Sequence, residues 1–124
     1  LNLQGLLKNV RFLGRKSGPE LANWVASSSA LIYVSYFEGF GLPVLEGMLS
    51  GVPVVTSNLT SIPEVGGDSV IYVDPFNEDS ITTGMEKAME NNQELIKKAL
   101  FQAKKFSWDI SALKVKDLLL NAKN

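Results

Sequence analysis

Two glutamates flank a glycine-rich segment near the middle of this 124-residue chain. Glu38 directly precedes Gly39-Phe40-Gly41, and seven residues separate it from Glu46. Apolar runs lie on both sides of the segment, although carboxylates are rarely fully buried unless they are paired. The pattern therefore indicates either structural hydrogen bonds to the two carboxylates or a ligand bound between them.

The glycine-rich segment joins two predicted elements. The apolar run Ala30–Ser35 is typical of a strand that is covered on both faces of its sheet. A helix is predicted over Leu42–Leu49, because Pro43 suits a first helical turn and Ser50-Gly51 ends the run. Doubly wound sheets bind ligands where the carboxyl end of a strand leads into the next helix. The segment therefore has the position of a binding loop.

We call Gly39–Leu42 the glycine loop. Glycine lets the backbone approach a ligand closely and adopt a positive φ where a turn needs it. The free N–H groups of Phe40, Gly41 and Leu42, together with the dipole of the following helix, form an anion site that suits a phosphate.

The two carboxylates extend this prediction. If the helix begins at Pro43, Glu46 lies on the same helix edge and leans back toward the loop. Its carboxylate would repel a diphosphate but would accept hydrogen bonds from neighbouring hydroxyls, such as a ribose diol. Glu38, at the other lip, is placed to face a sugar attached to the phosphate.

A structural alternative stays open for both acids. Acidic residues in a first helical turn stabilise a helix by about 0.3–1 kcal/mol without any ligand. The loop also matches neither the dinucleotide fingerprint nor the Walker sequence. The residues alone thus predict a site for a phosphate and hydroxyls, with structural roles as the alternative.

The rest of the chain predicts an α/β domain. The other expected elements are a strand at Val10–Leu13, a helix at Pro19–Ser28, a strand at Pro53–Thr56, a helical turn at Pro63–Val65, a strand at Ser69–Asp74, and helices from Glu78 onward, the last one after Ser107-Trp108. Alternating strands and helices favour a parallel sheet. Met85 and Met89 follow Ile81 at a spacing of four, so we expect them in the core.

Composition excludes several kinds of function. Lys and Arg total 12 against 13 acids, which argues against a nucleic-acid surface or a polybasic membrane patch. The chain has neither cysteine nor histidine, so disulfides, Cys/His zinc sites and a Ser-His-Asp triad within it are excluded. No apolar run approaches the roughly 18–20 residues of a membrane span. The abrupt start at Leu1 predicts a piece of a longer protein.

Several short motifs in series resemble a known family. The sequences "EGFGLPVLE", "SGVPVVTSN", "PEVGGD", "YVDP" and "FSW" follow one another between Val10 and Trp108. Together they resemble the C-terminal, donor-binding domain of retaining GT-B glycosyltransferases, of the large group 1 family that includes mannosyl- and glucosyltransferases and sucrose synthases. The resemblance implies a Rossmann-like parallel sheet with flanking helices. It also implies that residues 1–124 are part of a nucleotide-sugar binding domain, with the N-terminal acceptor domain absent.

The resemblance implies a role for each site residue. Glu38 would be catalytic, contacting the donor sugar and steadying positive charge at its anomeric carbon. The substrate-binding positions would be Gly39, Phe40, Gly41 and Leu42 for the sugar and diphosphate, Glu46 for the ribose hydroxyls, and the backbone around Phe12 to Gly14 for the nucleobase. Neither a cofactor nor a metal is implied, the nucleotide-diphosphate sugar being the donor substrate.

The implied function is retaining transfer of a sugar to a glycan, lipid or small-molecule acceptor through the missing domain. The family's basic pair that neutralises the diphosphate lies upstream of "VRFLG" and has no counterpart here, and Arg15 and Lys16 are interpreted as solvated loop charges. We therefore expect this chain alone to be inactive. A cytoplasmic location is implied, with any attachment to a membrane through the missing part. The alternatives are a non-catalytic sugar-nucleotide-binding or interaction module and, with less support, a GT-B-like epimerase.

Other residues carry weaker expectations. Thr56, Ser57 and Asn58 end a strand on the ligand edge, where either ligand binding or turn chemistry explains them. Glu64 is expected to tie a loop to the sheet. The remaining expectations are core or helix-docking positions for Trp24 and Trp108, a turn at Asp74-Pro75, and a pair between Glu94 and Lys98 on a solvated helix face.

Overall fold

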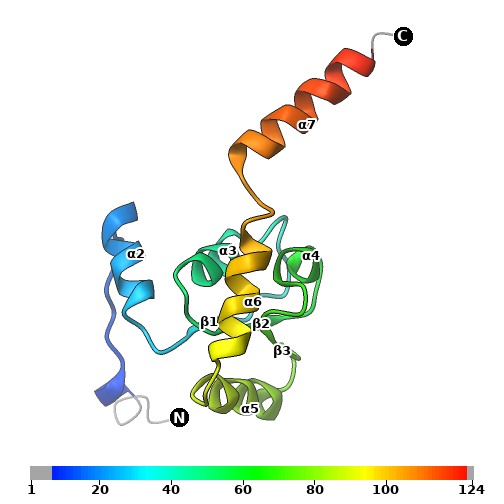
Figure 1. The fold of residues 1–124 in the computed structure, drawn as a ribbon. Helices are drawn as coiled ribbons and strands as arrows, with labels where there is room; N and C mark the ends of the chain where they lie inside the picture. Colours follow the sequence, from blue (N-terminus) through cyan, green and yellow to red (C-terminus); the bar gives the residue numbers. More distant parts are fainter. Residues whose placement is uncertain (1–6, 123–124) are drawn as a thin grey trace.

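A small parallel sheet forms the centre of the computed structural model, which describes residues 7–122 (Figure 1). Within that range the sheet has three strands in the order β1 (Leu31–Tyr33), β2 (Val54–Ser57) and β3 (Ile71–Val73). Both pairs of neighbours are parallel, and their register aligns Tyr33 with Thr56 and Thr56 with Tyr72. The chain is therefore α/β with a parallel sheet, as the alternating pattern predicts.

Helices cover both faces of the sheet. The described residues form the 3-10 helix η1 (Leu7–Asn9) and the α-helices α2 (Gly18–Ala26), α3 (Leu42–Leu49), α4 (Ile62–Gly66), α5 (Glu78–Ala88), α6 (Gln93–Ala103) and α7 (Trp108–Asn121). Of these, α3, α4 and α6 cover one face of the sheet and α5 covers the other. Side chains of α3, α4 and α6 pack with Val54 of β2 in one core cluster, whereas Ala88 of α5 packs with Val55 and Val73 in a second cluster. The result is the three-layer, Rossmann-like arrangement.

Two glycines let helices lie directly on the sheet. A Cβ at Gly47 of α3 would come within 2.7 Å of side-chain atoms of Leu31 and Val54. A Cβ at Gly84 of α5 would come within 2.3 Å of Val73. Real Cβ atoms do not approach so closely, because interiors are already packed at crystal-like density. Gly47 therefore lets α3 lie directly on β1 and β2, and Gly84 lets α5 lie directly on β3.

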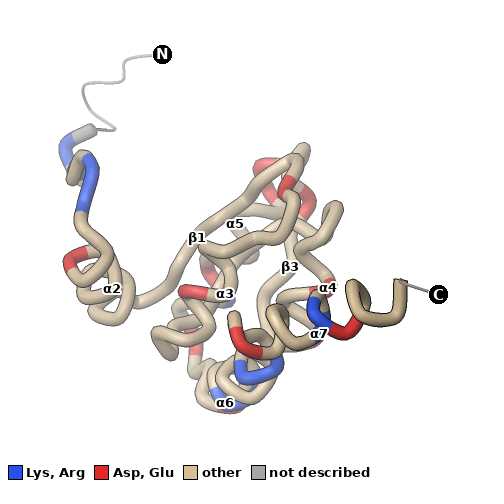
Figure 2. The backbone as a smooth tube through the Cα atoms, turned by 90° about the horizontal axis from the view of Figure 1, so that it is seen from above, with Lys and Arg blue, Asp and Glu red and all other residues tan. Residues whose placement is uncertain are grey.

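The predicted strand at Val10–Leu13 is wrong. The segment has no regular secondary structure and leads into α2, and the side chain of Phe12 is 82% exposed. In Figures 1 and 2 this segment and α2 stand to one side of the sheet. A β-prone run becomes a strand only where a neighbouring strand pairs with it, and within residues 7–122 no strand does.

The core positions expected for Met85 and Met89 are also wrong, and neither Trp24 nor Trp108 lies in the core. Met85 and Met89 are 46% and 68% exposed, because Gly84 and Ala88 occupy the face of α5 that meets the sheet. Trp24 is 42% exposed and lies under the Arg11 guanidinium, 5.5 Å from the ring centroid. Trp108 is 83% exposed at the start of α7.

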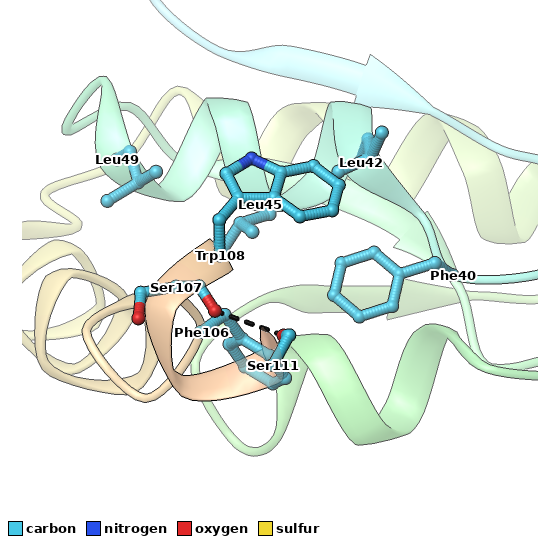
Figure 3. Close-up of a pocket in the computed structure, with 8 residues that line it drawn as sticks. All are labelled: Phe40, Leu42, Leu45, Leu49, Phe106, Ser107, Trp108 and Ser111. Carbon is cyan, nitrogen blue, oxygen red and sulfur yellow. Dashed lines mark hydrogen bonds between the residues drawn. The ribbon is translucent and has the colours of Figure 1, made fainter. Parts of the chain in front are cut away.

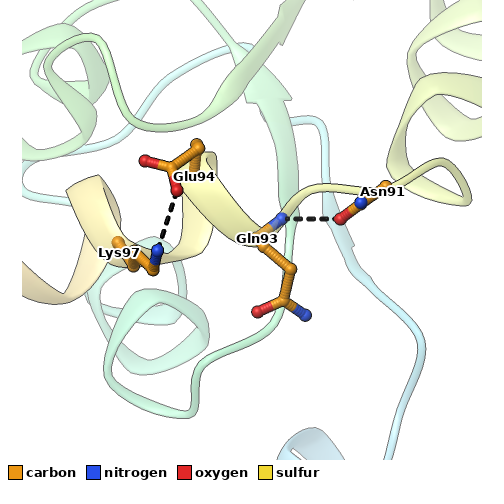
Figure 4. A network of polar contacts seen from close by, with 4 residues as sticks. All are labelled: Asn91, Gln93, Glu94 and Lys97. Carbon is orange, nitrogen blue, oxygen red and sulfur yellow. Dashed lines mark hydrogen bonds and ion pairs between the residues drawn. The ribbon is translucent and has the colours of Figure 1, made fainter.

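The expected ion pair on α6 has a different partner. Lys97 contacts Glu94 at 2.8 Å (Figure 4), while Lys98 turns toward Asp68 at 3.6 Å. Gln93 also donates its backbone N–H to the Asn91 side chain at 3.3 Å, at the start of the helix (Figure 4). The charged groups of both ion pairs are exposed to solvent, so each pair contributes roughly 0–1 kcal/mol to the stability of the fold.

The last helix extends away from the body (Figure 1). Ser107 caps it by accepting a hydrogen bond from the Ile110 backbone N–H at 3.1 Å, as expected for a helix that follows Ser107. None of the α7 side chains that the structure describes is buried. Over residues 7–122, no helix combines the length and the apolar character needed to cross a bilayer.

Candidate functional site

The glycine loop lies where the sequence places it, between the carboxyl end of β1 and the start of α3. Gly41 caps α3 with φ 97° and ψ 44°, in the left-handed region. A Cβ at this position would come within 2.6 Å of Cδ1 of Ile62, the first residue of α4. Both the backbone conformation and the close approach of α4 therefore require glycine here.

The loop leaves backbone donors free at the positive end of α3. Val44 and Leu45 donate their N–H groups to the carbonyl oxygen of Gly41, which closes the first turn. Among the described residues, the N–H groups of the glycine loop, residues 39–42, have no hydrogen-bond acceptor. The first N–H groups of a helix need such partners, and with the helix dipole they attract an anion.

Glu38 is half-buried at the other end of the loop and is held from three directions. Its Oε1 accepts a hydrogen bond from the Tyr33 hydroxyl at 2.5 Å. Its backbone N–H donates to Oγ1 of Thr60 at 3.1 Å, and its carbonyl oxygen accepts from Oγ of Ser61 at 2.8 Å. The hydrogen bond to the Glu38 carboxylate is the main reason why the pKa of the Tyr33 phenol lies above its usual 10.0, with burial and the carboxylate charge adding to it.

Glu46 is exposed on the edge of α3. The helix begins at Leu42, as predicted, and not at Pro43, the start assumed in placing Glu46. Glu46 is therefore its fifth residue, and α3 has no acid in its first turn. The helix dipole stabilises acids in the first turn, so it does not explain why an acid stands at position 46. Residues three and four apart share a helix face, so Glu46 lies on the same side as Leu42 and Pro43. Within residues 7–122 it forms no ion pair.

The end of β2 adds polar groups beside the loop. Oγ of Ser57 donates to the Ser35 carbonyl oxygen at 2.6 Å, which ties the segment after β1 to β2. Thr56 is fully buried, and its Oγ1 has no hydrogen-bond partner in the described part of the chain. Asn58 is exposed. The Ser57 hydroxyl therefore has a structural role, in line with the structural one of the two explanations given for this segment, ligand binding and turn chemistry.

Phe12 and Gly14 are not part of the loop cluster. They lie on the irregular segment before α2, where Gly14 has φ 64°. Figures 1 and 2 both show that this segment lies apart from α3. Arg15 and Lys16 follow on the same segment, and neither is within 4.0 Å of a carboxylate among residues 7–122. Glu38, the glycine loop and Glu46 thus lie on one continuous stretch that ends in α3, whereas Phe12 and Gly14, which were expected to contact a nucleobase, lie on a separate segment.

Glu64 does not tie its loop to the sheet through its carboxylate, which is exposed. Instead, its backbone carbonyl oxygen accepts a hydrogen bond from the Gln102 side chain of α6 at 3.3 Å. The expected turn at Asp74-Pro75 is present, because Oδ1 of Asp74 accepts the Phe76 backbone N–H at 2.9 Å. Sequence reasoning did not find Tyr33, Thr60 or Ser61, whose contacts with Glu38 are made by the fold.

An apolar groove of about 470 Å³ lies beside the loop, between α3 and the start of α7 (Figure 3). Its lining residues are Phe40, Leu42, Leu45, Leu49, Phe106, Ser107, Trp108 and Ser111. The rings of Phe40 and Phe106 meet edge to face at 5.7 Å, so Phe40 turns its side chain into the groove. The groove has no charged lining residue, and the described residues hold no cluster of His, Cys, Asp or Glu suited to a metal ion.

The fold and the loop together define a class of protein. Open α/β sheets of this kind place their ligand sites at loops that lead from the carboxyl end of a strand into the next helix, which is the position of the glycine loop. The fold is shared with sucrose-phosphate synthase from Thermosynechococcus elongatus, with a TM-score of 0.83 at 21% identity, over 97% of this chain and 33% of that chain. The fold is that of a GT-B C-terminal domain.

Sequence comparison then identifies the family. The family described as Glycosyl transferases group 1 matches residues 2–106, so the chain belongs to it. O-antigen chain mannosyltransferase B of Escherichia coli is 40% identical over 103 residues, 81% of this chain and 27% of that protein. O-antigen chain mannosyltransferase RfbU of Salmonella typhimurium is 36% identical over 90 residues, 73% of this chain and 24% of that protein. The chain thus spans about a quarter of the length of these relatives.

Proposed function

We propose that this chain binds a nucleotide-diphosphate sugar and holds its anomeric carbon for retaining transfer to a glycan, lipid or small-molecule acceptor. The observation that carries the proposal is the row of free N–H groups on the glycine loop, with Glu38 on one side and Glu46 on the other. Membership of the glycosyltransferase family supports it. The relatives named as mannosyltransferases favour mannose as the first donor sugar to test.

The diphosphate is assigned to the loop amides and the N-terminus of α3, where the helix dipole favours negative charge. Glu46 is assigned to the ribose hydroxyls, because a carboxylate accepts hydrogen bonds from two neighbouring hydroxyls. The nucleobase is assigned to the backbone around Phe12–Gly14, which the family resemblance alone supports.

Glu38 is assigned to the sugar. In the reaction, the bond between the anomeric carbon and the diphosphate breaks, and the acceptor oxygen bonds to that carbon on the same face. The acceptor proton passes to the leaving phosphate. Positive charge builds up on the sugar ring in such transition states, and a fixed carboxylate nearby stabilises it. Only Oε1 of Glu38 is hydrogen-bonded within the described residues, so Oε2 is available to the sugar.

The loop amides carry partial charges only, and no described Lys or Arg lies against the loop in an ion pair with Glu38 or Glu46. A basic pair outside this chain is therefore proposed to neutralise the diphosphate in the whole protein, and an N-terminal domain to bind the acceptor. On this proposal the chain binds a donor weakly and does not turn it over. Neither a cofactor nor a metal is assigned.

Calorimetric titration with UDP, GDP and ADP tests the proposal. We expect one of the three to bind saturably, and Glu46→Ala to weaken that binding by about 10- to 150-fold, the equivalent of a lost hydrogen bond to a charged group. Glu86→Ala is the matched control, since Glu86 is an exposed acid on α5, on the other face of the sheet. Equal affinities of the two variants would contradict the assignment of Glu46, and binding of none of the three would contradict the donor site.

A further inference from the structure

We propose that Tyr33, Thr60 and Ser61 are positioning residues that hold the Glu38 carboxylate in the orientation needed to face the donor sugar. The inference rests on the proposed function for the role of Glu38. It goes further by assigning a task to three residues outside the glycine loop. We call the three residues together with Glu38 the Glu38 clamp.

The first part of the clamp acts on the carboxylate itself. The Tyr33 hydroxyl donates to Oε1 of Glu38 at 2.5 Å, from the last residue of β1. Tyr33 is half-buried and packs against the core cluster beneath α3, so its ring is a rigid support. The phenol is protonated at neutral pH and therefore donates, and the hydrogen bond to Glu38 raises its pKa further above the usual 10.0. One carboxylate oxygen is thus fixed while the other stays free.

The second part acts on the backbone on both sides of the Glu38 side chain. Thr60 accepts the N–H of Glu38 and Ser61 donates to its carbonyl oxygen, at 3.1 and 2.8 Å. These partners are 22 and 23 residues away in the sequence, at the turn between β2 and α4. The two bonds fix both peptide groups that flank the Glu38 Cα. The direction in which the side chain leaves the backbone is therefore fixed, and the bond from Tyr33 then holds its carboxylate end.

Backbone strain at Thr60 supports a purpose beyond a simple turn. Its φ of 53° is the one positive value at a non-glycine residue in the described chain. A β-branched residue is disfavoured in this region, where Gly or Asn would serve at lower cost. Threonine at this position supplies Oγ1 as the acceptor for Glu38, which glycine lacks. Strained residues of this kind are typical of functional sites whose surroundings hold them in place.

The clamp can be tested by binding, because it should affect the affinity for a nucleotide sugar and not the affinity for the free nucleoside diphosphate. We would titrate the chain with GDP-mannose, UDP-glucose and ADP-glucose, each beside its free nucleoside diphosphate. Tyr33→Phe and Thr60→Val should weaken sugar-nucleotide binding about tenfold, one hydrogen bond's worth, and leave diphosphate binding unchanged. Thr60→Ser, which retains the hydroxyl, should keep the affinity of the unmodified chain.

Tyr72→Phe provides the matched control. Tyr72 lies in the same cross-strand row, on the other side of Thr56, but its hydroxyl donates to the Gly67 carbonyl oxygen at 2.8 Å. We expect this variant to bind both kinds of ligand normally. An equal loss of sugar-nucleotide and diphosphate binding in Tyr33→Phe would show a merely structural role and overturn the clamp. Unchanged binding of both would overturn it as well.

A second measurement decides on the clamp if no nucleotide binds, which would refute the proposed function alone. Carbon-13 NMR of ring-labelled tyrosines, assigned with Tyr33→Phe, reports the pKa of each phenol. The pKa of Tyr33 should fall in Glu38→Ala, and hydrogen exchange of the Glu38 amide should accelerate in Thr60→Val relative to Thr60→Ser. A Tyr33 pKa that does not respond to Glu38→Ala would refute the clamp whatever the ligand does.

Discussion

Replacing Gly41 by alanine perturbs the glycine loop at the point where α4 supports it. An L-residue at φ 97° is strained by roughly 1–2 kcal/mol. The new Cβ would also meet Cδ1 of Ile62 at 2.6 Å, and overpacking of this kind costs about 1–3 kcal/mol. We therefore expect Gly41→Ala to lower the free energy of unfolding by roughly 2–5 kcal/mol in total. That is a large share of the roughly 5–15 kcal/mol of a typical domain.

The assay is urea denaturation followed by circular dichroism, with Gly39→Ala as the control. Gly39 belongs to the same loop, but a Cβ there meets nothing within 4 Å and its φ lies outside the left-handed region. We expect that control to change stability by less than about 0.5 kcal/mol. A loss in Gly41→Ala no greater than in Gly39→Ala would refute the reasoning.

A double variant separates the two causes of the loss. Ile62→Val removes Cδ1 and by itself should cost about 0.5–1.5 kcal/mol. In the Gly41→Ala background it also relieves the steric contact, so its cost should shrink or change sign. The coupling between the two sites should therefore lie in the range of roughly 0.5–3 kcal/mol found for residues in contact. If the free-energy losses of the two single variants simply add in the double variant, the strain in Gly41→Ala lies in the backbone alone.

The remaining predictions concern the sheet. Gly84→Ala should destabilise the chain by about 1–3 kcal/mol in the same denaturation assay, because its Cβ would overlap β3; a neutral result would contradict the close packing of α5. Thr56→Val removes a buried hydroxyl without a partner in the described residues and should stabilise by about 1 kcal/mol, seen by calorimetry as a rise in Tm of roughly 4 °C; a fall in Tm would show that the hydroxyl is bonded. The raised pKa of Tyr33 contributes stability that is fully present below the unfolded value near 10.0 and is lost as pH rises through the higher folded value. Unfolding measured above pH 10 should therefore show a smaller pH dependence in Tyr33→Phe, and an identical dependence would contradict the bond to Glu38.

Local patterns in the sequence were enough to predict the elements that position the site. The bounds of α3, Leu42–Leu49, follow from Pro43 and from the Ser50-Gly51 stop, which are local signals. The parallel sheet follows from the alternation of strands and helices. Strand pairing is not local, and for that reason Val10–Leu13 was predicted as a strand although no strand pairs with it within residues 7–122.

The core face of α5 shows a second limit of periodicity. Met85 and Met89 share the four-residue spacing of Gly84 and Ala88, one position away on the helix. The spacing cannot distinguish the two rows. The structure selects the small pair because α5 lies so close to β3 that no larger side chain fits there.

The candidate site also has one part that the local sequence predicts and one part that depends on the fold. The glycine loop and the two glutamates are close together in the sequence, so their types and spacing alone identify them as candidates. The clamp on Glu38 was not predictable, because Thr60 and Ser61 reach it only through the parallel pairing of β1 with β2. The strained φ of Thr60 likewise has no sequence signal, since threonine is an unfavoured choice for that conformation.

The most direct test of the central claim is a nitrogen-15 NMR titration of this chain with GDP, UDP and ADP. Backbone amide signals of Gly39 and Gly41 report on the loop itself, and Gly51 and Gly84 serve as internal references away from it. We expect saturable shifts of the two loop glycines with one of the three nucleotides, while the signals of the reference glycines stay unchanged. No shift at Gly39 and Gly41 while other amides respond, or no response to any nucleotide, would contradict the assignment of the loop as the diphosphate site.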